Sequence, residues 1–235
     1  MRRSRLAPDS GPRTLISHVV AADTPTIDSD VLSAYVEGFV SEDDALVSAR
    51  KRGVELGCSP ISPLGGAALR LLATTLRARA VVEIGTGSGV SGLYLLRGMA
   101  PDGVLTSIDV EPEFQGAAKR AFSGAGMGPG RARLIMGRAL EVLPRLTEEA
   151  YDLLYVSGSR QEYPGYLEQG VRLLRPGGVI AFDNVLLAGQ ITNPARRDPE
   201  AVALREVIRT VREDDRLVPV LLPLGDGLLV AAKAH

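Results

Sequence analysis

The 235-residue sequence is poor in the side chains on which many common sites depend, with one cysteine, two histidines and no tryptophan. Because Cys58 is the single cysteine, an intrachain disulfide and a metal cage built only from cysteine are both excluded. The two histidines, His18 and His235, both lie near the ends of the sequence. We therefore expect no histidine to act as the general base of an active site in the body of the chain.

Neither sign of charge is in excess, since there are 27 basic and 28 acidic residues. Binding to DNA or RNA requires clustered positive charge, so a nucleic acid is not expected as a partner. No apolar run is long enough to cross a bilayer, so a membrane is not expected as a partner either. Arg2, Arg3 and Arg5 resemble the start of a signal peptide, but Pro8 and Asp9 stand where an apolar stretch would be required. These features predict a cytoplasmic protein.

The first part of the chain differs in composition from the rest. Residues 1–27 are rich in Arg, Pro, Ser, Asp and Thr with little periodicity, which predicts a mobile N-terminal arm. Residues 28–235 are predicted to form a single domain that begins with helices. Apolar residues recur at helical spacing from Val31 to Val40, and Ser41 can cap a second helix that runs towards Gly57. The apolar side chains of the first helix need burial, which predicts a homodimer.

Apolar strand patterns alternate with helical patterns through the rest of the chain. After a helix-breaking connector and a helix over 67–77, the predicted strands span 80–85, 104–110, 132–136, 151–157 and 178–185. The predicted helices between and after them span 89–99, 112–123, 139–149, 163–174 and about 199–212. Residues 217–232 predict two further strands around a Gly-Asp-Gly turn. The predicted fold is α/β: a doubly wound, Rossmann-like, mostly parallel seven-stranded sheet with an antiparallel C-terminal strand pair and N-terminal helices.

A glycine-rich segment follows the strand over 80–85 and predicts a small-molecule site. Glu83 is followed by Gly85, Gly87 and Gly89, after which a helical pattern resumes. Glycine allows positive φ and close approach of a ligand, and the free N–H groups at a helix start can donate to it. Glu83 would repel a pyrophosphate but can accept hydrogen bonds from the ammonium group of an amino acid. A nicotinamide or flavin fold, which uses the different spacing G-x-G-x-x-G, remains the alternative.

A second acidic residue, Asp109, ends the strand over 104–110. In doubly wound folds a carboxylate at this place binds ribose hydroxyl groups. This combination resembles the pattern of the class I methyltransferases that bind S-adenosylmethionine. Their first motif is an acidic residue, one spacer and G-x-G-x-G, and a second acidic residue ends the next strand.

From Ile61 to the C-terminus, the sequence resembles more specifically the catechol and caffeoyl-CoA type O-methyltransferases. The matching positions are Glu83-Ile84-Gly85, Gly89, Ser91, Asp109, Tyr163 and Ala181-Phe182-Asp183-Asn184-Val185. This resemblance implies S-adenosylmethionine as the cofactor and a small molecule as the methyl acceptor. It also implies a set of cofactor-binding residues: Ile61, Glu83, Gly85, Thr86, Gly87, Ser91, Asp109, Val110 and, near the adenine, Ala139.

The sequence departs from this family at two positions that matter for catalysis. Ser157 stands where the family has an aspartate that binds a divalent metal, and Arg160 stands where it has a lysine that acts as base. The other two family metal ligands, Asp183 and Asn184, are present and are weak candidates. Mg²⁺ favours carboxylate oxygens and arginine stays protonated, so we expect weak or no metal dependence. The candidate catalytic residues are Arg160, which can hold a carboxylate or phosphate of the acceptor, and Asp183, which can receive a proton.

Simpler interpretations of these residues remain open. Residues 157–159 can form a flexible turn, Arg160 can pair with Glu162 in solvent, and Asp183-Asn184 can be a polar turn after a buried strand. The favoured function is S-adenosylmethionine-dependent methyl transfer to an oxygen of a small molecule. The alternatives are a cofactor-binding protein of the same fold that has lost catalysis and, third, a nicotinamide or flavin oxidoreductase.

Overall fold

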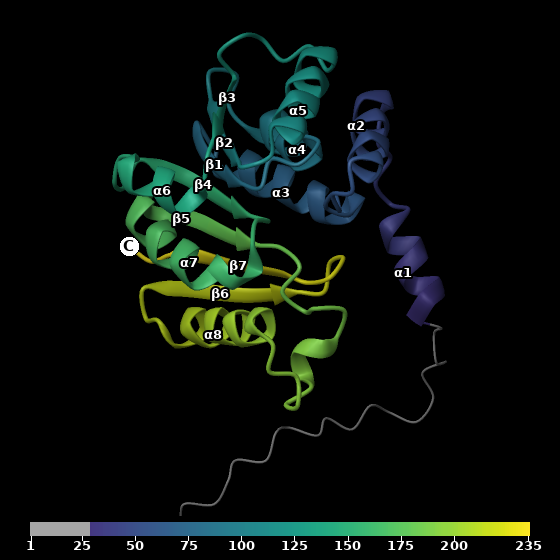
Figure 1. The fold of residues 1–235 in the computed structure, drawn as a ribbon. Coiled ribbons are helices and arrows are strands. Elements are labelled where there is room, and N and C mark those ends of the chain that lie inside the picture. Colours follow the sequence, from purple (N-terminus) through teal and green to yellow (C-terminus); the bar gives the residue numbers. More distant parts are fainter. Residues whose placement is uncertain (1–28) are drawn as a thin grey trace, which may run out of the picture.

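Seven strands form one mixed sheet in the computed structural model, which describes residues 29–235 (Figure 1). The strand order is β3-β2-β1-β4-β5-β7-β6. Neighbours among β1 to β5 pair in parallel, and β7 is antiparallel to both β5 and β6. This arrangement confirms the predicted fold class. The strands are β1 (Ala80–Ile84), β2 (Val104–Asp109), β3 (Ala132–Met136), β4 (Tyr151–Val156), β5 (Leu174–Phe182), β6 (Leu217–Leu222) and β7 (Leu228–Lys233).

Helices cover both faces of this sheet, so its central strands are buried on two sides (Figure 1). In β4, Leu153 and Tyr155 pack with residues of α2 to α5, and Leu154 and Val156 pack with residues of α6 to α8. Parallel strands covered on both faces are apolar at nearly every position, which explains the continuous apolar runs of the sequence. The helices are α1 (Ser29–Glu37), α2 (Asp44–Glu55), α3 (Pro63–Thr75), α4 (Val90–Gly98), α5 (Pro112–Gly124), α6 (Ala139–Val142), α7 (Tyr163–Leu173) and α8 (Pro199–Glu213).

Three predicted helix limits are wrong, each because one residue decides the end. The helix expected from residue 67 begins at Pro63, since the Ser62 side chain accepts a hydrogen bond from the Gly65 N–H at 3.1 Å and proline is well suited to the first turn. Helix α2 is capped by Asp43 and not by Ser41. The helix expected over 139–149 ends at Val142 and continues as one 3₁₀ turn, η1 (Leu143–Arg145), because it contains a proline.

Helix α1 lies at the edge of the molecule (Figure 1). Its last residue, Glu37, accepts hydrogen bonds from the Ser62 hydroxyl at 3.1 Å and the Leu64 N–H at 3.3 Å. These bonds tie α1 to the start of α3. The predicted arm over residues 1–27 lies outside the described residues.

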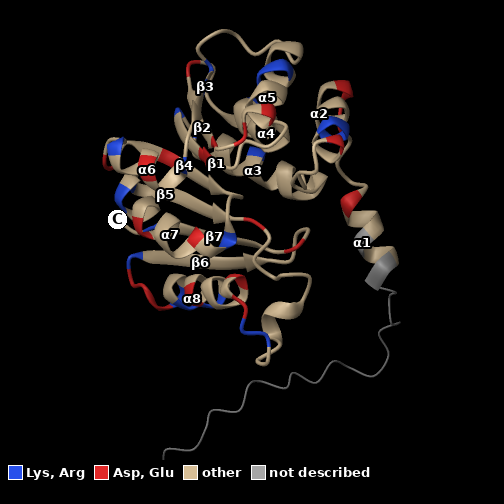
Figure 2. Cartoon of the chain, viewed as in Figure 1, with Lys and Arg blue, Asp and Glu red and all other residues tan. Residues whose placement is uncertain are grey.

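Charged residues of both signs are interspersed over the described helices and loops (Figure 2). Several arginines are paired with a neighbouring carboxylate, such as Arg97 with Asp43 at 2.7 Å. Between Ser29 and His235, no helix combines the length and the hydropathy needed to cross a membrane.

Candidate active site

Two cavities adjoin one another at the carboxyl ends of β1, β2 and β4, where the strand order changes direction. The first has a volume of about 260 Å³ and the second of about 320 Å³. They share Gly85, Asp109, Gly158 and Ser159 in their linings. Together they form a site of the size that a small-molecule ligand needs.

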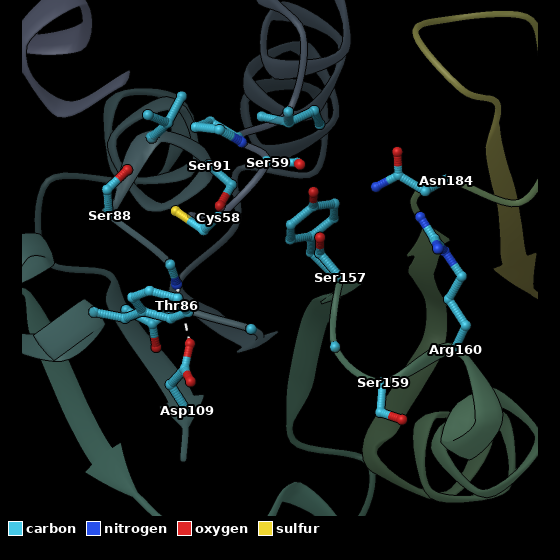
Figure 3. A pocket seen from close by; sticks show the side chains of 18 of the residues that line it. Cys58, Ser59, Thr86, Ser88, Ser91, Asp109, Ser157, Ser159, Arg160 and Asn184 are labelled. Carbon is cyan, nitrogen blue, oxygen red and sulfur yellow. Dashed lines mark hydrogen bonds between the residues drawn. The ribbon is translucent and has the colours of Figure 1, made fainter. Parts of the chain in front are cut away.

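The structure places eight of the nine predicted cofactor residues around these two cavities. They come from the connector before α3, the glycine loop after β1, the end of β2 and the start of α6. The first cavity, of which Figure 3 labels Thr86, Ser91 and Asp109, is lined by Ile61, Gly85, Thr86, Gly87, Ser91 and Asp109. The second is lined by Gly85, Asp109, Val110 and Ala139.

The ninth predicted residue, Glu83, is fully buried and lines neither cavity. Its carboxyl group accepts hydrogen bonds from the Ser91 hydroxyl at 2.6 Å and from the Ser107 hydroxyl at 2.5 Å. Glu83 is connected to the first cavity through Ser91, which lines that cavity and is hydrogen-bonded to Glu83. Burial raises the pKa of Glu83 from an ordinary 4.5 to about 7, although both hydrogen bonds oppose the shift.

This shift predicts a pH dependence of stability. A carboxyl group whose pKa is raised in the folded state stabilises the fold fully below its unfolded pKa, and this contribution is lost as the pH rises through about 7. Compared with Glu83→Gln, which stays neutral, the wild type should lose about 1–3 kcal/mol of unfolding free energy between about pH 4.5 and about pH 8. Urea unfolding of both proteins at the two pH values measures the difference. An equal difference at both values would mean that folding does not raise the pKa of Glu83.

The Asp109 carboxylate is held in place from two sides. Its Oδ2 accepts a hydrogen bond from the Gly87 N–H at 3.0 Å, and its Oδ1 accepts one from the Glu111 N–H at 3.0 Å (Figure 3). Each carboxylate oxygen keeps a second lone pair that can accept from a ligand. Since Asp109 lines both cavities, it lies at their junction, where a ligand that fills both would pass.

Asp183 is buried, and its neighbour Tyr155 separates it from the first cavity. The Tyr155 hydroxyl donates to Asp183 Oδ2 at 2.8 Å, and the Asn184 N–H donates to Oδ1 at 2.9 Å. Tyr155 and Asn184 line the cavity, whereas Asp183 does not. Burial raises the pKa of Asp183, and these two hydrogen bonds and the charge of Arg160 oppose the rise.

Arg160 lines the first cavity beside Asn184 (Figure 3). Its Nη1 atom lies 3.3 Å from Oε2 of Glu200 on α8, which also lines the cavity. The interpretation that Arg160 pairs with Glu162 in solvent is wrong, because Glu162 pairs with Arg138 at 2.8 Å. Sequence reasoning missed Glu200, since α8 lies far along the chain from Arg160.

The donor set at this end of the cavity does not fit a hard divalent cation. In the catechol and caffeoyl-CoA type O-methyltransferases that the sequence resembles, three residues hold the metal. Of the equivalent residues here, only Asp183 carries a negative charge, and both of its oxygens already accept hydrogen bonds. The positive charge of Arg160 also acts on Asp183. Glu200, the other carboxylate near Arg160, is already paired with it.

Sequence reasoning also missed Ser88 and three residues of the connector before α3. The Ser88 hydroxyl is buried and has no hydrogen-bond partner among the described residues, although Ser88 lines the first cavity. Cys58, Ser59 and Pro60 line the same cavity. The sequence offered one signal that these residues could line the site, namely the position of the connector directly before the glycine-loop unit.

Sequence comparisons match the chain to one family. A sequence model of the O-methyltransferase family matches residues 34–234. A relative from Mycolicibacterium vanbaalenii, named "Putative O-methyltransferase", is 53% identical over 205 residues, which are 87% of this chain and 91% of the relative.

Two solved structures have the same overall architecture. A protein from Corynebacterium glutamicum matches with a TM-score of 0.82 and 33% identity, over 88% of this chain and 97% of the other. The O-methyltransferase TomG of Streptomyces achromogenes, solved in complex with S-adenosylmethionine, matches with a TM-score of 0.79 and 29% identity, over 87% of this chain and 96% of the other.

Proposed function

The chain belongs to the O-methyltransferase family, and we propose that it transfers the methyl group of S-adenosylmethionine to an oxygen of a small-molecule acceptor. The observation that best supports this proposal is that two adjoining cavities meet at Asp109, a carboxylate at the end of β2. One elongated ligand with a ribose in its middle suits this arrangement.

The residues around the cavities fit this cofactor. Val110 and Ala139 would hold the adenine, Asp109 the ribose hydroxyls, and Ser91 the amino acid end. When bound, S-adenosylmethionine supplies a methyl group that its sulfonium already activates. The protein must then align the acceptor oxygen with that methyl group and keep water out.

Arg160 and Asn184, which line the other end of the first cavity, would hold the acceptor. The pair between Arg160 and Glu200 is partly exposed, with 32% and 39% of the two side chains accessible, so it contributes little stability. A carboxylate or phosphate of the acceptor can therefore displace Glu200 and bind the planar guanidinium. We propose an acceptor that carries such an anionic group.

We propose that methyl transfer has weak or no metal dependence. Activity should survive EDTA, and Ser157→Asp should raise Mg²⁺ affinity by adding a second carboxylate to Asp183 and Asn184. Ser159→Asp is the matched control, because the Ser159 side chain points away from Asn184 (Figure 3). Methyl transfer assays with EDTA or Mg²⁺, and Mg²⁺ titration by calorimetry, measure both effects. Activity that disappears with EDTA and returns with Mg²⁺ would contradict the proposal.

Calorimetry with S-adenosylmethionine and with NAD separates the proposed function from its alternatives. Binding of S-adenosylmethionine alone, with methylated product from a panel of phenols and catechols that includes carboxylate-bearing members, supports the methyltransferase. Binding without any product supports a protein that has lost catalysis, and binding of NAD instead supports an oxidoreductase.

We also propose a homodimer that forms through α1. Its apolar side chains are highly exposed for such residues, as shown by Tyr35 at 75% and, just beyond the helix, Phe39 at 82%. Phe39→Glu should therefore give a monomer, while Val54→Glu, at a residue of α2 that is 68% exposed, should leave the dimer intact. Light scattering at micromolar concentration measures both masses. A wild-type protein of monomer mass would refute the dimer.

The cytoplasmic location predicted from the sequence is part of the same proposal. A single cysteine suits a reducing compartment, in which disulfides do not persist.

A further inference from the structure

We propose that Tyr155 is a catalytic residue whose phenol oxygen takes the proton of the acceptor hydroxyl while its own proton passes to Asp183. This role rests on the proposed methyl transfer to oxygen. It names the group that receives the acceptor's proton in a site where Arg160 stands in place of a lysine base.

The sheet brings Tyr155 and Asp183 together. Tyr155 on β4 pairs with Ala181 on β5, and two residues further on Asp183 follows on the same face of the sheet. The Tyr155 side chain is 1% exposed and its hydroxyl donates to Asp183 Oδ2 at 2.8 Å. The Tyr163 hydroxyl donates to the backbone oxygen of Asp183 at 3.0 Å, which fixes the end of β5.

The direction of this hydrogen bond decides what Tyr155 can offer the cavity. A phenol has one proton, and here that proton is directed to the buried carboxylate. The phenol oxygen keeps lone pairs that can accept from a hydroxyl group. Tyr155 lines the cavity and Asp183 does not, so the Tyr155 hydroxyl offers the acceptor a hydrogen-bonded link to the buried carboxylate.

Tyr155 acts as a neutral relay and not as a phenolate base. Burial and the nearby Asp183 carboxylate raise the pKa of Tyr155 well above its ordinary value. A hydrogen bond with the Ser157 side chain lowers this pKa by a smaller amount. The phenol proton is already hydrogen-bonded to Asp183 Oδ2, so the phenol can pass it on as it receives another. Among the described residues, the two carboxylates that line the first cavity are engaged: Glu200 with Arg160, and Asp109 with the Gly87 N–H.

The proposed step balances in atoms and charge. The acceptor oxygen forms a bond to the methyl carbon as the carbon–sulfur bond breaks, and the electron pair of that bond stays on sulfur. The acceptor proton moves to Tyr155 Oη and the former phenol proton moves to Asp183 Oδ2. The products are a methyl ether, a neutral thioether and a neutral carboxylic acid, so the positive sulfonium and the negative carboxylate disappear together.

Tyr155→Phe tests this role, because it removes the hydroxyl and keeps the ring. With catechol as acceptor, kcat should fall by about 10²-fold or more, while the affinity for S-adenosylmethionine measured by calorimetry stays unchanged. Tyr94→Phe is the matched control: Tyr94 is also buried and its hydroxyl donates to a carboxylate, Glu42, at 2.9 Å, but it lies outside the cavity. It should keep the wild-type kcat.

Two further measurements distinguish a relay from a structural role. Asp183→Asn should cause a similar loss, and the double variant with Tyr155→Phe should lose little more, because the two groups act as a unit. With 4-nitrophenol, which is already ionised near neutral pH, the loss in Tyr155→Phe should be much smaller than with catechol.

Equal losses on the two acceptors, or a wild-type kcat in Tyr155→Phe, would overturn the relay. If Asp183→Asn fails to fold, the comparison of acceptors with Tyr155→Phe still decides. A wild-type protein that binds S-adenosylmethionine but methylates none of the phenols would instead refute the proposed function, and the relay with it.

Discussion

Gly85→Ala is expected to abolish measurable cofactor binding and to lower the free energy of unfolding by about 2–5 kcal/mol. Gly85 has a φ of +89°, a conformation that costs a residue with a Cβ about 1–2 kcal/mol. In addition, a Cβ at this position would lie 2.7 Å from the backbone oxygen of Ser157. Because Gly85 lines both cavities, any movement that relieves this clash shifts the glycine loop away from the end of β4 and deforms the site.

Gly126→Ala separates the cost of the positive φ from the cost of the steric clash. Gly126 has a φ of +72°, but nothing lies within 4 Å of the position that a Cβ would take. This variant should therefore lose only about 1–2 kcal/mol of unfolding free energy and bind the cofactor normally. Urea unfolding and calorimetry with S-adenosylmethionine measure both quantities. If Gly85→Ala matched Gly126→Ala in stability and bound the cofactor, the close contact between the loop and β4 would not hold the site together.

Asp109→Ala is expected to weaken S-adenosylmethionine binding by about 10- to 100-fold, a loss of about 1.5–3 kcal/mol. The side chain accepts from the Gly87 N–H and the Glu111 N–H, so its orientation is set before a ligand arrives. The charge-assisted hydrogen bonds to ribose hydroxyls would be lost, and the Gly87 N–H would lose its partner as well.

The control for this variant is Asp215→Ala, which removes a carboxylate from the exposed loop before β6. It should leave the dissociation constant unchanged. Calorimetry on both folded variants makes the comparison. An unchanged affinity in Asp109→Ala would remove Asp109 from the cofactor site and leave the junction of the two cavities without a ribose-binding group.

The order of helices and strands could be predicted because local pattern and final environment agree through most of the core. In β4, Leu153 and Leu154 face opposite helical layers and both are buried, as the continuous apolar pattern indicates. Prediction failed at helix ends, where a single residue decides. Pro63 reads as a break in sequence but begins α3, because Ser62 before it supplies the cap.

The candidate site could be predicted where its residues end or closely follow a strand, as Asp109 and Asn184 do, since the carboxyl ends of parallel strands meet at one edge. Tyr155 lies inside its strand, and only the pairing of β4 with β5 shows that it reaches Asp183. Glu200 comes from α8, forty residues after its partner Arg160. Contacts of this kind depend on tertiary packing, which no local pattern contains.

A crystal structure grown with S-adenosylhomocysteine and millimolar Mg²⁺ tests the central claim most directly. It should show the ligand across both cavities, with its adenine beside Val110 and Ala139, its ribose on Asp109 and its amino acid end beside Ser91, and no ion at Asp183. A ligand bound elsewhere, or a Mg²⁺ ion ligated by Asp183 and Asn184, would contradict the account.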